Sequence, residues 1–162
     1  GRAMGLSGVD GSLLEAQPLS PELGYVGQIT RVNPEPIKAI LKAGYIPVIA
    51  PLALDTAQGQ LLNVNADAAA AEIAISLKAE RLVFLSDVPG VMDRAGRLVT
   101  KLSPPEARAL LSSGVASGGM QPKLEACLSA LRKVSCCRII DGRVAHALLE
   151  EKDGRGTTMA VD

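Results

Sequence analysis

Leu62-Asn63-Val64-Asn65-Ala66-Asp67, followed by alanines at 68–71, is the stretch that decides how the rest of the chain is interpreted. Polar residues crowd here between apolar runs. Asn65 has a side chain suited to a helix N-cap, and Asp67 then falls in the first helical turn, where its charge complements the helix dipole. Capping needs one polar residue rather than three, so the stretch predicts a capped helix and leaves open a functional role for the others.

Apolar runs of strand length alternate with helix-like segments along the chain. Short strands are expected among the glycine-rich residues 5–33, and others at 45–51, 81–85, 138–140 and 158–161. Helices are expected at 33–44, 66–79, 103–112, 122–131 and 144–150. The run at 45–51 is continuous, which predicts a strand buried on both faces. The alternation predicts an α/β fold with a mostly parallel sheet covered on both faces.

Composition and charge narrow the possible partners. The chain has 162 residues, 48% of them hydrophobic, which is enough for a real core. Basic and acidic residues balance at 17 each, so no net field steers the molecule toward nucleic acid or an anionic membrane. With one Phe, two Tyr and no Trp, base-stacking platforms are scarce. We therefore expect neither nucleic acid nor a membrane as a partner.

The cysteines and the histidine argue against a metal site. Cys127, Cys136 and Cys137 have neither paired metal-ligand spacing nor a C-x-x-C pattern, and free thiols fit a reducing cytoplasm. His146 lies in a helix-like run with nothing nearby to complete a ligand set, so it is interpreted as a packed or surface residue. A Ser-His-Asp triad through His146 lacks the G-x-S-x-G elbow that would support it.

Two loops fall where ligands bind in open parallel sheets, beyond the carboxyl ends of strands. Ser86–Gly90 directly follows the strand at 81–85 and is either an ordinary turn or a ligand loop. The other loop, Gly118–Lys123, has glycines that let backbone amides approach an anion, and a helix expected to start at Pro122 would present free N–H groups. Lys123 near that start opposes the helix dipole at a cost of about 0.3–1 kcal/mol, which a bound phosphate would reverse. A solvated lysine is the alternative, and no P-loop motif occurs.

Three segments together resemble the acetylglutamate kinase branch of the amino acid kinase family, in order and spacing: Leu62–Asp67, Leu85–Val91 and Gly118–Lys123. Further similarity is found at Gly5–Gly11, Glu22–Gly27 and Gly44–Val48. The resemblance implies a three-layer αβα sandwich with a mainly parallel sheet. It also implies ATP-dependent phosphorylation of the side-chain carboxylate of N-acetyl-L-glutamate, the second step of arginine biosynthesis.

The resemblance also implies roles for individual residues. Asn63 would contact acetylglutamate, Asp67 would orient catalytic lysines, and Lys123 would stabilise charge on the transferring phosphoryl group. The nucleotide, accompanied by Mg²⁺, would lie against two groups of residues: Ser86, Asp87, Val88, Pro89, Gly90, Val91 and Met92, and Gly118, Gly119 and Met120. Residues 1–79 would be the remainder of the acetylglutamate-binding lobe, and residues 80–162 the nucleotide-binding lobe.

Two departures from the family pattern leave alternatives open. The family's N-terminal part, with its glycine-rich phosphate loop and second catalytic lysine, has no counterpart here, so we expect this stretch alone to have little kinase activity. Ile139–Leu149 resembles the arginine-inhibited branch, but the following 150–158 is shorter, so inhibition by arginine and a hexamer are both open. A homo-oligomer, dimer or hexamer, is expected. The alternatives are a related kinase with another carboxylate substrate and an inactive kinase-like module that senses arginine.

Overall fold

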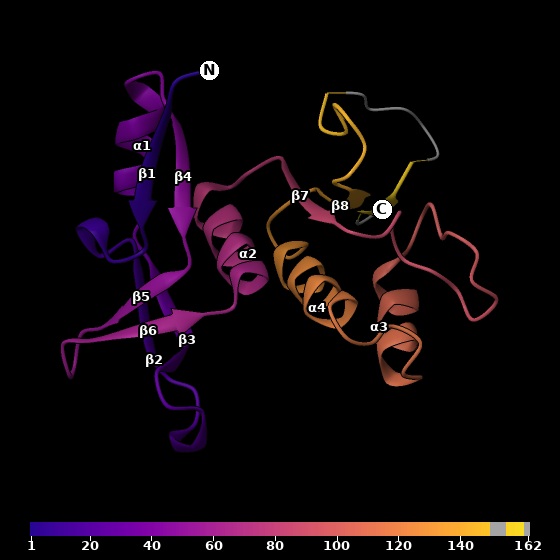
Figure 1. Cartoon of the computed structure of the whole chain (residues 1–162), viewed down its shortest axis with the longest axis horizontal. Helices are drawn as coiled ribbons and strands as arrows, with labels where there is room; N and C mark the ends of the chain where they lie inside the picture. The colour runs from indigo at the N-terminus through magenta and orange to yellow at the C-terminus, as the bar shows by residue number, and fades with distance from the viewer. Residues whose placement is uncertain (150–154, 161–162) are drawn as a thin grey trace. The chain divides into compact units, whose positions relative to one another are not determined.

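The structure, a computed structural model, describes residues 1–149 and 155–160. The chain divides into two compact units, Gly1–Leu77 and Lys78–Asp162. The elements of the first unit are β1 (Ala3–Ser7), β2 (Leu14–Pro18), β3 (Val26–Val32), α1 (Glu35–Lys42), β4 (Ile46–Ala50), β5 (Leu52–Asp55), β6 (Gln60–Val64) and α2 (Ala66–Leu77) (Figure 1). Those of the second are β7 (Arg81–Ser86), α3 (Pro104–Ser112), α4 (Met120–Ala130), β8 (Cys136–Asp141) and β9 (Thr157–Ala160). Short 3₁₀ turns lie at Asp10–Ser12 and Pro21–Leu23. The predicted α/β class, with parallel strand pairing, is confirmed.

In the first unit, β1 and β4 form a parallel two-stranded sheet, with Ala3 opposite Ile46 and Ser7 opposite Ala50. α1 packs beside β4. Along β4 the exposed and half-buried positions alternate, and Ile46 and Val48 are each 58% exposed. The expectation that 45–51 is buried on both faces is therefore wrong. A run of apolar residues shows only that the side chains are apolar, whereas their burial depends on which elements cover each face of the strand. Among the described residues only one face of β4 is packed.

The other strands of this unit close into a barrel in the order β2-β3-β6-β5. β5 and β6 form an antiparallel hairpin, and β6 runs parallel to β3. The core of the unit is apolar and consists of Leu13, Leu14, Ala16, Ile37, Ala53, Leu62, Val64 and Ala69. Gly8 enters this packing so closely that a Cβ there would lie 2.0 Å from the Leu52 carbonyl oxygen.

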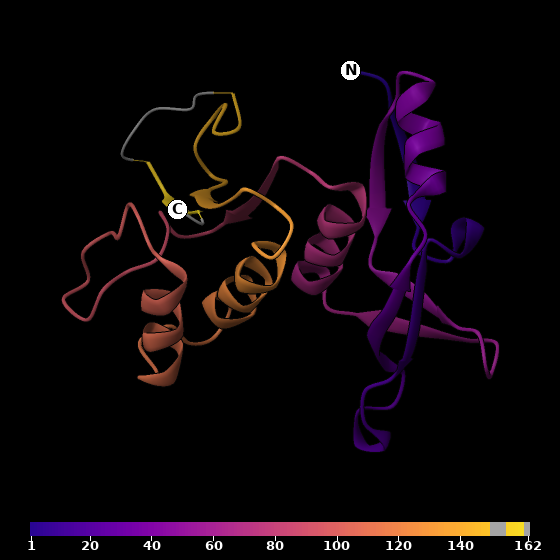
Figure 2. The ribbon, with the colours of Figure 1, turned by 180° about the vertical axis from the view of Figure 1, so that it is seen from behind.

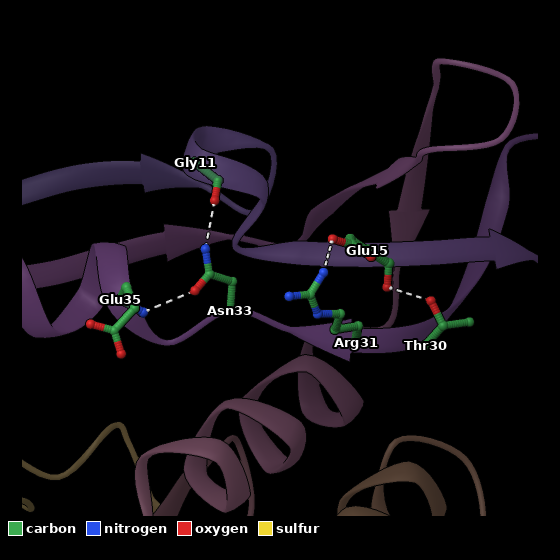
Figure 3. A network of polar contacts seen from close by, with 6 residues as sticks. All are labelled: Gly11, Glu15, Thr30, Arg31, Asn33 and Glu35. Atoms are coloured by element: carbon green, nitrogen blue, oxygen red, sulfur yellow. Dashed lines mark hydrogen bonds and ion pairs between the residues drawn. The ribbon is translucent and has the colours of Figure 1, made fainter.

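Polar contacts link the turn at Gly11 to the start of α1 and join β2 to β3, as Figure 3 shows. Asn33 donates from Nδ2 to the Gly11 carbonyl at 2.9 Å and accepts from the Glu35 N–H at 3.3 Å, so one side chain links a turn to the start of α1. Arg31 and Glu15 form an ion pair between β3 and β2 at 3.0 Å. Arg31 is 69% exposed in this pair, so solvent screens it and its contribution is about 1 kcal/mol or less.

In the second unit, β7 runs parallel to β8, with Ser86 opposite Asp141, and β9 runs antiparallel to β8. α4 packs against β7 and β8, and α3 packs against α4 (Figure 2). Ser103 and Glu106 form a capping box at the start of α3. The Ser103 side chain accepts from the Glu106 N–H, and the Ser103 N–H donates to Glu106 Oε2 at 2.8 Å. None of the helices within the described ranges combines the length and apolar character that crossing a bilayer requires.

Some predicted element boundaries are wrong. Residues 144–149 form successive turns instead of a helix, since His146 has φ +57° and interrupts any helical run; Glu150 lies outside the described residues. α2 ends at Leu77 rather than at 79, because Lys78 takes a left-handed conformation with φ +53°. β9 covers most of the predicted strand at 158–161, although Val161 is not among the described residues.

Candidate functional site

The opening motif spans the junction between β6 and α2 in the first unit. Leu62 and Val64 are buried in the core, whereas Asn63 between them is exposed, as the two-residue period of a strand requires. Asn65 is the N-cap: its Oδ1 accepts from the Ala68 N–H at 3.0 Å. The predicted capping role is confirmed, and it accounts for only one of the polar residues in the motif.

Asn63 and Asp67 are the other two polar residues of this motif. The Asn63 backbone pairs on both sides, with its N–H donating to the Tyr25 carbonyl at 2.8 Å, while its side chain lies on the exposed face of β6. Asp67 is half-buried in the first turn of α2, where a carboxylate complements the dipole. Both side chains therefore belong to the first unit and flank the same strand-to-helix junction.

In the second unit, charged groups gather at the carboxyl ends of β7 and β8. The Gly142 N–H donates to the Ser86 carbonyl at 2.8 Å, so the two strand ends are joined beyond the ladder. Arg143 donates from Nε and Nη2 to Asp141 at 2.9 and 2.8 Å, and these bonds lower the pKa of Asp141 to about 2. Asp141 and, more weakly, Asp87 raise the pKa of Arg143.

The two predicted loops meet around one small cavity. We call Ser86–Met92 the β7 loop and Ser117–Met120 the α4 turn. The cavity has a volume of about 180 Å³ and is lined by Val88, Gly90, Val91, Met92, Val115, Ala116, Ser117 and Met120. Both loops thus contribute, although Gly118 and Gly119 are not among its lining residues. Val115, Ala116 and Ser117 were missed from the sequence; their only signal was their position in a short segment between Gly114 and Gly118.

The α4 turn differs from expectation in one respect. The helix begins at Met120, two residues before Pro122. The N–H groups of Met120 and Gln121 donate to the carbonyls of Ser117 and Gly118, each at 3.2 Å. The predicted helix start at Pro122 is therefore wrong, and the N–H groups of the actual first two residues are already used by a tight turn. Lys123 is half-buried in the first turn of α4, where its cation opposes the helix dipole.

A second, larger cavity of about 370 Å³ is bordered by the β7 loop at Pro89. Its lining includes Arg138, Asp141 and Arg155, together with Val144 and Ala147 from the turns after β8. Arg138 donates from Nη2 to the Arg155 carbonyl at 3.0 Å. The cavity therefore combines cationic, anionic and apolar groups.

The sequence matches the model of the amino acid kinase family over residues 1–141. It is 48% identical over 155 residues to an acetylglutamate kinase of Parasynechococcus marenigrum (strain WH8102), covering 93% of this chain and 53% of that relative. It is 45% identical over 166 residues to an acetylglutamate kinase of Clostridium beijerinckii, covering 97% of this chain and 58% of that relative. The chain spans about half the length of the curated relatives it matches.

A solved structure is also similar to this chain. It is the N-acetylglutamate synthase of Neisseria gonorrhoeae in complex with coenzyme A and L-arginine, with a TM-score of 0.85 and 27% identity, covering 99% of this chain and 38% of that one. The match to the family model covers most of the described residues in both units. The chain therefore belongs to the amino acid kinase family.

Proposed function

We propose that this chain provides the nucleotide side and part of the acceptor side of an acetylglutamate kinase. Such an enzyme transfers a phosphoryl group from ATP to the side-chain carboxylate of N-acetyl-L-glutamate, in arginine biosynthesis. The observation that carries the proposal is that the β7 loop and the α4 turn, distant in sequence, line one cavity, and that Met120 of this lining begins the helix that carries Lys123. The similarity to acetylglutamate kinases over nearly the whole chain supports the choice of substrate.

In this proposal the second unit binds ATP and the first binds part of the acceptor. The β7 loop and Met120 form walls for the nucleotide, at the carboxyl end of a parallel strand pair, and Gly118 and Gly119 let the backbone before Met120 approach it. Lys123 stabilises negative charge that develops on the transferring phosphoryl group. Phosphoryl transfer needs positioning and cations more than a covalent nucleophile, and a half-buried lysine at a helix start meets that need.

The polar residues of the first unit take the acceptor roles. Asn63 has an exposed amide that can donate to and accept from acetylglutamate. Asp67, half-buried in α2, orients cationic side chains of the reaction centre.

Mg²⁺ accompanies the nucleotide in this proposal. Among the described residues, no group of three His, Cys, Asp or Glu side chains could hold a metal ion by itself. That fits Mg²⁺, which is usually bound through substrate phosphates, water and one or two carboxylates rather than by an all-protein cage. When bound, the ion neutralises phosphate charge.

The test is formation of acyl phosphate, trapped as the hydroxamate, by the full-length protein that carries this sequence. Lys123→Ala should lower turnover about 100-fold or more while changing acetylglutamate binding little, because its cation acts mainly in the transition state. Lys133→Ala is the matched control, an exposed lysine of the same unit whose loss should leave turnover unchanged. Equal turnover of the two variants would remove Lys123 from the proposal, and turnover of a different carboxylate in preference would identify a related kinase.

A second candidate function is arginine sensing by a kinase-like module. One observation favours it: the similar synthase of Neisseria gonorrhoeae was solved with L-arginine. The 370 Å³ cavity bordered by Arg138 and Asp141 offers charges of both signs to a zwitterionic amino acid. Calorimetric titration separates the candidates, because a sensor should give heat with L-arginine and none with ATP.

We also propose a reducing cytoplasmic location and self-association. Cys127, Cys136 and Cys137 form no disulfide among the described residues, which supports a reducing compartment. The exposed Ile46 and Val48 of β4 support an additional partner surface in the assembled protein. Light scattering of the purified full-length protein gives its mass, and a monomer at micromolar concentration would exclude self-association.

A further inference from the structure

Thr157 links three segments that are distant in sequence. It is the first residue of β9, and its side chain is completely buried. Its hydroxyl accepts from the Val91 N–H at 2.8 Å and donates to the Val99 carbonyl at 2.6 Å. The Val99 N–H in turn donates to the Val91 carbonyl at 2.8 Å. The backbone of Val91 is therefore held on both sides, and one of its two bonds depends on a single hydroxyl 66 residues away.

Gly90 makes room for this hydroxyl. A Cβ at position 90 would lie 2.8 Å from Thr157 Oγ1 and 3.0 Å from the Thr157 backbone nitrogen. Contacts that short are repulsive for any side chain, so the absence of a Cβ is what lets the β7 loop approach β9. The close approach and the hydroxyl bridge are separate observations that fix the same two residues, Gly90 and Val91.

These two residues are part of the wall of the 180 Å³ cavity, together with Val88 and Met92. We propose that Thr157 is a positioning residue, which sets the β7 loop at the place where that loop can bind ATP. The proposal rests on the nucleotide role of the loop given above. Thr157 itself is buried beneath the loop and acts only through Val91 and Val99.

The energetic reason is the burial of the groups that Thr157 joins. Without its hydroxyl, the buried Val91 N–H and the half-buried Val99 carbonyl would lose their partner, at a cost that proteins usually avoid by moving the backbone toward water. A shift of Val91 moves the wall of the cavity. Thr157→Val keeps the branched side chain but puts a methyl group in place of the hydroxyl, so both hydrogen bonds are lost and the methyl group also pushes on Val91 and Val99.

The experiment compares three variants of the full-length protein. Thr157→Val removes the bridge, Thr157→Ser retains it, and Thr158→Val makes the same change one residue along β9, where the side chain is half-buried. Affinity for ATP with Mg²⁺ is measured by calorimetry, and the exchange rate of the Val91 amide by NMR. Thr157→Val should weaken ATP binding about tenfold and speed exchange at Val91, while the other two variants stay within about twofold of the wild type.

The readouts separate the possible failures. If the wild type binds ATP and Thr157→Val binds as tightly as Thr158→Val, the positioning role is overturned and the nucleotide role of the loop stands. If the wild type does not bind ATP, the proposed function fails, and exchange at Val91 still decides whether Thr157 holds the loop. Should Thr157→Val not fold, Thr157→Cys replaces it, because a thiol is a much weaker donor and acceptor than a hydroxyl.

Discussion

The β7 loop and the α4 turn border the same cavity but are held in different ways. The β7 loop depends on Thr157, which reaches it from β9. The α4 turn is held by its own backbone, through the bonds from Met120 to Ser117 and from Gln121 to Gly118, with no side-chain cap on Gly119. One wall of the cavity is thus set by tertiary structure and the other by local structure.

The glycines of the β7 loop and the α4 turn also differ in whether distant residues or the local backbone constrain them. Gly90 is buried and crowded, since a Cβ would meet Thr157 and Leu98. Gly118 has φ +56° and no atom within 4 Å of where its Cβ would be. The first glycine is required by a close approach, whereas the second is required only by its backbone conformation. Substitutions in the two walls should therefore differ in their cost to the fold.

Gly90→Ala should have the largest effect. Its methyl group would collide with Thr157 and Leu98, and its backbone, at φ +154°, is one that side chains rarely adopt. We expect a loss of about 2–4 kcal/mol in the free energy of unfolding, from overpacking together with backbone strain. Equilibrium unfolding in urea measures it. A loss below about 1 kcal/mol would mean that β9 can shift at little cost, which would contradict the conclusion that tertiary contacts fix the β7 loop.

Gly118→Ala should cost less, about 1 kcal/mol, because only the left-handed conformation opposes it and a stiffer unfolded chain offsets part of the strain. Gly118→Asn serves as the control, since asparagine tolerates this conformation better than alanine and should recover part of the loss. The same urea experiment applies. A loss as large as that of Gly90→Ala would contradict a purely local role for the α4 turn.

The smallest effect concerns pH and lies at Asp141, the residue of β8 that pairs with the first residue of the β7 loop. Hydrogen bonds from Arg143 hold the pKa of Asp141, beside the end of the β7 strand, at about 2, below its usual value of 3.8. A carboxyl with a depressed pKa stabilises the folded state above its unfolded pKa and loses that contribution as pH falls toward the folded pKa. The stability difference between the wild type and Asp141→Asn should therefore shrink between about pH 4 and about pH 2. The first turn of α4 has no acidic residue, so it makes no such contribution.

Urea unfolding of both proteins at several pH values measures this difference. Because Asp93 and Glu106 also have lowered pKa values, only the difference between the wild type and Asp141→Asn is informative. A difference that stays constant with pH would show that Asp141 contributes nothing through its charge.

Features that depend only on residues close together in the sequence could be predicted. Asn65 caps α2 and Ser103 caps α3, since a capping residue needs only its own helix. Both loops of the cavity were also identified, because they follow a strand or precede a helix in recognisable ways. The predictions from sequence failed where contacts with residues distant in the sequence determine burial or hydrogen bonding. The exposure of Ile46 depends on what covers a sheet face, and Thr157 looks like any strand threonine until Val91 and Val99 are placed beside it.

His146 illustrates a different failure. The pattern at 144–150 is apolar and helix-like, yet the backbone turns left-handed at His146 and only short turns result. Periodicity signals an amphipathic helix only if the backbone stays helical throughout, and one residue with positive φ is enough to end it.

The closure of the β2-β3-β6-β5 barrel has a consequence for aggregation. Closure reduces the open edge to which a strand of a neighbouring molecule can add, although β2 meets β5 only at Glu15 and Leu54. β4 is different, because within the described residues it pairs only with β1 and carries exposed apolar side chains. Pro47, in the middle of β4, lacks an N–H and so interrupts any strand added at that edge. At β4, a proline therefore opposes the addition of a foreign strand, as closure does for the strands of the barrel.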